Sequence, residues 1–226
     1  MNRFSLAAFF TLSLILPGSA FGAPTCEKFG DCIQKTLNHP NPIDQVLYAT
    51  QALKRWTPDI PERDLLNVLK LRGEALIALH LTGEAADLDP LSHAQSDYER
   101  FLKQAPGHWL ALSGLGRIAE LQENTVQALQ HFDAAVKTQQ PRAYAARAAF
   151  YSRQQRWKDA ITDWNQSLRL DERYQKRAMG MPTSERADIY YLRGQAYAFL
   201  KQALDERLDF EAACKLGHTV ACEAVK

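Results

Sequence analysis

One pattern of small and aromatic residues recurs along the chain and limits the folds that it can adopt. Gly116 and Ala128 are followed by Phe132, and Ala160 and Trp164 repeat the last two positions 32 residues later. Small residues allow two antiparallel helices to approach closely, while large aromatic residues fill the space between successive helix pairs. The pattern therefore predicts an all-α chain of stacked helical hairpins.

Two further copies of this pattern flank the central ones. The upstream copy has Gly73, Ala94 and Tyr98, and the downstream copy has Gly194 and Phe210. About nine extra residues separate Gly73 from Ala94, which predicts an insert between the two helices of the first copy. A second insert of about 12 residues, centred on 174–184, separates the third copy from the fourth.

The central copy resembles the 34-residue tetratricopeptide repeat (TPR), whose signature it matches at Leu112, Leu115, Gly116, Ala119, Ala128, Phe132 and Ala135. The resemblance implies an α-α superhelix of about four hairpins with flanking helices, in which the first helix of each hairpin lines a concave surface. The four units cover about 62–106, 107–140, 141–172 and 185–217 of a solenoid that spans 61–217. Glu206 departs from the family, which prefers alanine at that position.

Both flanks of the solenoid carry a pair of cysteines. The segment 24–60 contains Cys26, Cys32 and a predicted helix over 43–56. Cys214 lies near the end of the last repeat unit, and Cys222 lies in the short capping segment that follows it, 218–226. Three disulfide connectivities are possible, but the ends of an elongated solenoid lie far apart, so pairing within each flank is favoured. The run from Phe210 to Cys222 also resembles the cysteine-bearing Sel1-like repeats of secreted bacterial proteins, in which such a pair staples the hairpin.

The first 23 residues predict a signal peptide that is removed. Arg3 gives a short positive region, residues 6–17 are mostly apolar but too few to span a bilayer, and small residues follow. No other segment is apolar enough to cross a membrane. We therefore expect a periplasmic or secreted protein without an integral membrane segment after cleavage.

Charge is balanced overall but uneven along the chain. After removal of the signal peptide, 26 basic side chains face 26 acidic ones, which argues against bulk attraction to nucleic acid. Residues 57–135 carry twelve acidic and six basic side chains, and residues 137–177 carry ten basic and four acidic ones. The basic excess predicts a cationic face at Arg169, Arg173, Lys176 and Arg177.

Catalytic and cofactor motifs are absent from the sequence. The run from Gly114 to Ala119 matches the dinucleotide fingerprint G-x-G-x-x-A, but the repeat pattern already uses these positions and no strand precedes them. Neither cysteine pair has the C-x2-C spacing of zinc sites, and the six histidines are dispersed. We predict no catalytic residue, cofactor or metal.

The TPR resemblance also implies which side chains line the concave groove: Lys70, Glu74, Ser113, Arg117, Glu120, Arg142, Arg153, Tyr191, Gln195 and Phe199. Members of the family that clamp a terminal carboxylate use paired Lys and Asn residues, and this chain lacks those pairs. A mixed polar and apolar groove remains, suited to an extended or helical segment of a partner.

These observations predict an exported, non-enzymatic TPR protein that acts as an interaction adaptor or scaffold in the bacterial envelope. Its partner is a protein or peptide rather than nucleic acid, and it could also form homo-oligomers. Two alternatives stay open: a structural protein that self-assembles through its charge polarity, and an enzyme with a site in the groove or the inserts.

Overall fold

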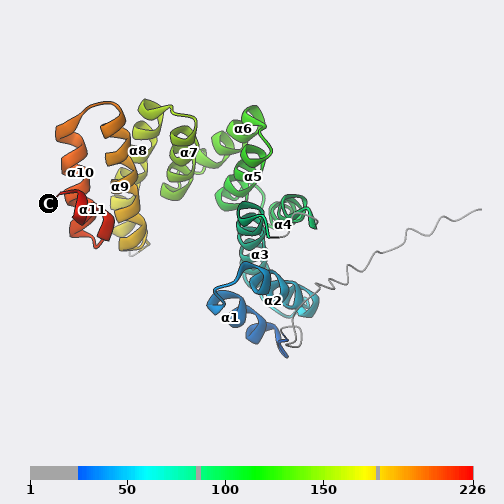
Figure 1. Ribbon diagram of the computed structural model, residues 1–226. Helices are drawn as coiled ribbons and strands as arrows, with labels where there is room; N and C mark the ends of the chain where they lie inside the picture. The colour runs from blue at the N-terminus through cyan, green and yellow to red at the C-terminus, as the bar shows by residue number, and fades with distance from the viewer. Residues whose placement is uncertain (1–24, 85–87, 177–178, 226) are drawn as a thin grey trace, which may run out of the picture.

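The computed structural model describes residues 25–84, 88–176 and 179–225, and these residues form eleven helices and no strand. The predicted signal peptide lies outside the described residues. Figure 1 shows the helices stacked as successive hairpins along a curved path, with α1 and α11 at opposite ends. This arrangement confirms the predicted all-α superhelix. The helices are α1 (Phe29–Asn38), α2 (Pro42–Arg55), α3 (Glu62–Thr82), α4 (Pro90–Gln104), α5 (Trp109–Leu121), α6 (Thr125–Val136), α7 (Pro141–Arg153), α8 (Trp157–Gln175), α9 (Thr183–Phe199), α10 (Ala203–Lys215) and α11 (Thr219–Ala224).

Glycine and an aromatic ring meet inside three of the hairpins. A Cβ atom on Gly116 would lie 3.0 Å from the ring of Phe132, and one on Gly194 would lie 2.7 Å from the ring of Phe210. Gly73 faces Tyr98 in the same way, at 2.8 Å. The missing side chain on the first helix therefore leaves the space that the aromatic side chain of the second helix fills.

A series of arginines ties successive hairpins together, and the sequence patterns above did not predict it. Arg72, Arg147 and Arg193 each lie immediately before the small residue of a first helix. Each forms two hydrogen bonds, of 2.6–2.8 Å, with an aspartate on the second helix of its own hairpin: Asp97, Asp163 and Asp209 respectively.

The third guanidinium nitrogen of each of these arginines reaches back to the preceding hairpin. Nη1 donates to Thr50 on α2, to Asp133 on α6 and to Asn165 on α8, respectively. We call these groups the arginine bridges. Their aspartates are almost fully buried, so each bridge places a paired charge where two hairpins meet.

The hairpin of the second repeat unit, α5–α6, lacks an arginine bridge. Leu115 stands at the arginine position and His131 at the aspartate position, directly before Gly116 and Phe132. Burial lowers the pKa of His131, which favours its neutral form. A leucine and a neutral histidine thus occupy the positions that an arginine and an aspartate hold in the hairpins with a bridge.

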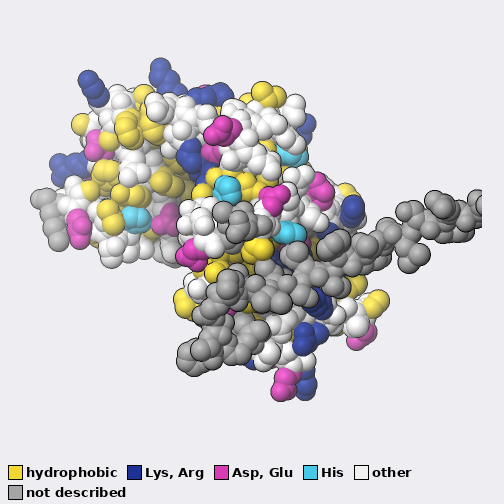
Figure 2. All heavy atoms as spheres, turned by 45° about the vertical axis from the view of Figure 1, so that its right-hand side comes forward, with side chains coloured by type: hydrophobic (Ala, Val, Ile, Leu, Met, Phe, Trp, Pro, Cys, Tyr) yellow, Lys and Arg dark blue, Asp and Glu magenta, His cyan; other side chains and the backbone are white. Residues whose placement is uncertain are grey.

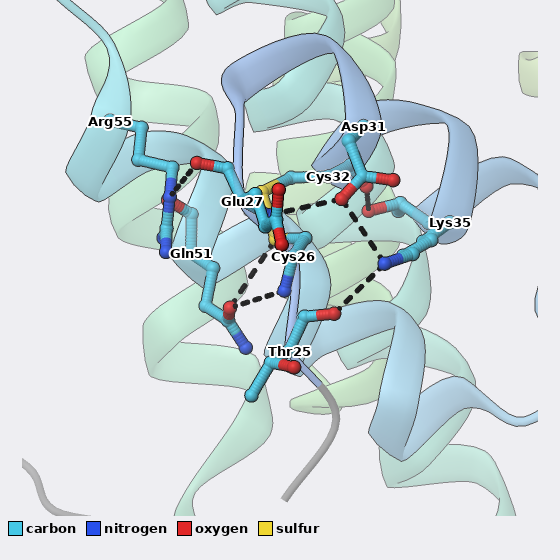
Figure 3. The surroundings of a disulfide bond; sticks show 9 residues. Thr25, Cys26, Glu27, Asp31, Cys32, Lys35, Gln51 and Arg55 are labelled. Carbon is cyan, nitrogen blue, oxygen red and sulfur yellow. Dashed lines mark hydrogen bonds and ion pairs between the residues drawn. A yellow bond between two sulfur atoms is a disulfide. The ribbon is translucent and has the colours of Figure 1, made fainter.

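The N-terminal flank forms a complete hairpin rather than a single helix. The predicted helix over 43–56 is α2, and α1 packs against it. Figure 3 shows that a disulfide joins Cys26 to Cys32 and that neighbouring side chains hold the start of this segment. Gln51 accepts a hydrogen bond from the backbone N–H of Cys26 (3.1 Å), and Arg55 donates to the carbonyl of Glu27 (3.2 Å).

The C-terminal flank is a six-residue helix, α11, fastened to α10 by the second disulfide, Cys214–Cys222. Tyr191 of α9 stacks on His218 at the start of α11, with ring centroids 4.2 Å apart. Both disulfides therefore pair cysteines within one flank, the pairing that the sequence favoured. The likeness to Sel1-like repeats stays a prediction.

Both inserts extend helices. The first contributes to the 21-residue length of α3, and Asp89 caps the start of α4 by accepting a hydrogen bond from the N–H of Ser92. The second continues α8 to Gln175, before α9 begins at Thr183. Between these helices the N–H of Met181 donates to the buried carboxylate of Asp171 (2.5 Å), which fixes the connection against α8.

Candidate binding groove

A cavity of about 570 Å³ lies along the first helices of the repeats, where the sequence places the concave groove. We call it the groove cavity. Side chains of α3, α5 and α7 contribute to it, together with Tyr98 of α4 and Glu185 of α9. Its lining consists of Lys70, Glu74, Ile77, Tyr98, Trp109, Leu110, Ser113, Gly114, Arg117, Arg142 and Glu185.

The Tyr98 ring is set deep in this cavity, between two glycines. A Cβ atom on Gly114 of α5 would lie 2.5 Å from Cζ of Tyr98, and one on Gly73 of α3 would lie 2.8 Å from the same atom. The ring is therefore held where α3, α4 and α5 meet. Burial raises the pKa of the Tyr98 hydroxyl, and the carboxylate of Glu74 adds to the shift, so the hydroxyl stays protonated at physiological pH.

The middle of the lining is largely apolar. Ile77, Trp109 and Leu110 present side chains that are only partly buried in the core clusters beneath them. The Oγ of Ser113 is buried and has no hydrogen-bond partner among the described residues. This part of the groove cavity could therefore accept an apolar side chain.

Ion pairs rim the groove cavity. Lys70 and Glu74 approach to 3.5 Å on α3. Glu74 is open to solvent on one side, but the groove walls partly desolvate it, and this desolvation raises its pKa despite the opposing charge of Lys70. Across the cavity, Arg142 of α7 binds Glu185 of α9 through two hydrogen bonds, of 2.6 and 3.0 Å.

A second group of charges adjoins the groove cavity through Arg117, which contributes to its lining. Glu120 accepts hydrogen bonds from Arg117 (2.8 Å) and from Arg153 (2.6 and 2.7 Å). Burial alone would raise the pKa of Glu120, but these hydrogen bonds outweigh it and hold the pKa below its ordinary value. Two of the predicted partner-binding arginines are thus already engaged with a third predicted residue.

The remaining predicted groove residues lie outside the cavity. Tyr191 is stacked under His218 and accepts a hydrogen bond from Gln195 (3.0 Å), so the C-terminal cap covers part of this surface. Phe199 stacks face to face on Trp157, with ring centroids 4.3 Å apart. A binding role for these three residues stays a prediction.

The predicted basic face lies on the extended part of α8. Arg169, Arg173 and Lys176 are exposed there, and Arg177 lies outside the described residues. The face is separate from the groove cavity, whose lining includes none of these residues.

Residues 25–84, 88–176 and 179–225 contain neither a membrane-spanning helix nor a cluster of side chains suited to a metal ion. No helix there combines the length and the apolar character needed to cross a membrane. In the same residues, no three His, Cys, Asp or Glu side chains gather in a way that could hold a metal ion.

The stacked hairpins form an all-α solenoid with the fold of TPR proteins. No protein-family model and no curated protein sequence matches the chain. Among solved structures, the segment of MamA from Desulfovibrio magneticus RS-1 that runs from residue 41 to the end has 16% sequence identity and a TM-score of 0.50, covering 84% of this chain and 94% of that one.

The C-terminal part of a TPR repeat-containing protein from Cytophaga hutchinsonii is similar to the same degree. It has 16% identity and a TM-score of 0.50, and the match covers 84% of this chain and 65% of that one. At such identities the likeness concerns the fold, and it agrees with the repeat signature in the sequence.

Proposed function

We propose that this chain is an exported, non-enzymatic TPR protein that binds an extended segment of a partner protein in its concave groove. The groove cavity is the observation that carries this proposal, because it combines an apolar centre with charged rims. Such a combination suits a peptide with alternating apolar and polar contacts. The partner's identity would define the process that the adaptor serves.

An envelope location is part of the same proposal. The apolar N-terminal stretch is typical of a signal peptide. Two disulfides, Cys26–Cys32 and Cys214–Cys222, account for all four cysteines and persist best in an oxidising compartment such as the periplasm. Both features support a role as an adaptor or scaffold outside the cytoplasm.

Peptides selected from a random linear display library against the mature chain should lose about tenfold or more in affinity when Lys70→Glu is combined with Leu110→Gln. This double variant reverses a rim charge and makes the centre of the groove polar, but it spares the Glu120 cluster. Fluorescence anisotropy of a labelled selected peptide measures the change.

The matched control is Lys103→Glu combined with Leu81→Gln. Both of these side chains are exposed and neither lines the groove cavity, so the control alters charge and apolarity equally at another site. Peptides that bind the groove variant and the control with equal affinity would place the binding site elsewhere.

Self-association is a second candidate function, favoured by exposed leucines on the last hairpin. Leu204 and Leu208 of α10 are 72% and 53% exposed, and the positions equivalent to Leu208 on the other second helices are the polar Ser96, Gln130 and Thr162. In the space-filling view of Figure 2, hydrophobic side chains are open to solvent on the part of the molecule that carries the C-terminal hairpins, at the left.

If these leucines join two copies, Leu204→Gln combined with Leu208→Gln should shift the protein to monomer, because burying apolar surface is the main favourable term in such contacts. Sedimentation velocity over a range of protein concentrations measures the change, and Val126→Gln, an exposed apolar residue on α6, is the control. A wild-type protein that stays monomeric throughout would rule this function out.

A further inference from the structure

The ion pair between Arg142 and Glu185 differs from the other pairs that join hairpins. It connects the first turn of α7 to the first turn of α9, 43 positions apart, and both side chains line the groove cavity. The side chains of Arg142 and Glu185 are 41% and 42% exposed, whereas the aspartate side chains of the arginine bridges are 3–7% exposed. Opening this pair leaves no buried charge unpaired, so the fold loses little.

Other cations of the groove are less free to change partners. Arg117 and Arg153 share Glu120, whose side chain is 8% exposed, and separating them from it would leave a buried carboxylate without its counter-charges. Arg142 is thus the groove arginine whose protein partner a ligand can replace at the smallest cost. A carboxylate matches the planar guanidinium best, because it accepts both hydrogen bonds at once.

An apolar surface belongs to the same cavity as this exchangeable arginine. Trp109 and Leu110 contribute to its lining, and both side chains are only partly buried in the core. A ligand that satisfies both features needs an acidic group and an apolar side chain on one short segment.

On the basis of the proposed groove function, we propose that the groove cavity selects peptide segments in which an acidic side chain lies next to an apolar one. The acidic side chain takes the place of Glu185 on Arg142, and the apolar one packs against Trp109 and Leu110. Glu185 acts as an internal competitor that occupies Arg142 until such a segment binds. The apparent affinity for the segment then equals the intrinsic affinity multiplied by the fraction of molecules in which Glu185 has released Arg142.

The test uses the mature chain and a display library of random linear peptides. Peptides selected by the wild type should be enriched in Asp or Glu beside Trp, Leu, Ile or Phe. They should bind Glu185→Gln roughly threefold to tenfold more tightly than the wild type, since this variant keeps the shape of the side chain but removes the competing charge. Arg142→Gln should lose the preference for acidic peptides over their amide counterparts.

Glu211→Gln is the matched control, because Glu211 forms a comparable pair with Arg207 on α10, outside the groove cavity. If selected peptides depend on Lys70 and Leu110 but show no acidic enrichment, or if Glu185→Gln binds them no better than the wild type, the competitor role is refuted and groove binding stands. If no selected peptide depends on Lys70 and Leu110, groove binding fails and the competitor role fails with it.

Discussion

Arg147→Ala should lower the free energy of unfolding by about 3–5 kcal/mol, because it removes the positive charge from a bridge whose aspartate stays buried. Arg147 donates to both carboxylate oxygens of Asp163, at 2.7 and 2.8 Å, and to Asp133 of the preceding hairpin at 2.7 Å. The side chain of Asp163 is 6% exposed and would lose its counter-charge. Urea denaturation followed by circular dichroism at 222 nm, roughly the helix minimum, measures the change.

The chain itself supplies the control for this variant. Leu115 and His131 occupy the corresponding positions of the α5–α6 hairpin, so Arg147→Leu combined with Asp163→His copies an arrangement that the same stack already accommodates. We expect this double variant to recover a large part of the lost stability, since replacing a buried pair by packed side chains is often close to neutral. A cost below about 1 kcal/mol for Arg147→Ala alone would show that the bridge adds no net stability.

Tyr98→Ala should also cost about 3–5 kcal/mol of stability, and it should abolish peptide binding in the groove cavity. Tyr98 is 2% exposed, and its ring packs against Gly73 of α3 and Gly114 of α5. Its removal leaves a void, because neither glycine has a side chain that could fill the space. The same void lies in the lining of the groove cavity. Thermal denaturation and peptide anisotropy measure the two effects on one sample.

Two related variants separate the ring from its hydroxyl. Tyr98→Phe should change stability by less than about 0.5 kcal/mol, because the hydroxyl has no hydrogen-bond partner among the described residues. Gly114→Ala should destabilise although alanine favours helices, since its Cβ would lie 2.5 Å from the ring. A stable Gly114→Ala variant with unchanged peptide affinity would contradict the packing role of Tyr98.

The arginine bridges left a signal in the sequence that the repeat pattern did not use. An arginine precedes the small residue in Arg72-Gly73, Arg147-Ala148 and Arg193-Gly194, and an aspartate precedes the aromatic residue in three of the second helices. Seen separately, these charges look like ordinary polar helix positions. Their pairing depends on the angle between two helices and on the direction of each side chain, which periodicity does not contain.

The residues that line the groove cavity were likewise predicted only in part from the sequence. Lys70, Glu74, Ser113, Arg117 and Arg142 were predicted from their positions on first helices, and all five line the groove cavity. The contributions of Tyr98 and Glu185 were not predicted, because one comes from a second helix and the other follows an insert. Whether a second helix or a segment after an insert reaches the groove cavity depends on the path of the chain between repeats.

The sequence by itself determined the all-α class, the hairpin repeat and the favoured pairing of cysteines within each flank. These properties follow from spacings that recur every few residues or every repeat, and neighbouring contacts in a solenoid are short in sequence. Only the tertiary structure decided that Glu185 occupies Arg142, that α11 covers Tyr191, and that Tyr98 lies between Gly73 and Gly114. Each of these contacts joins different helices, so it depends on how the hairpins pack rather than on any local pattern.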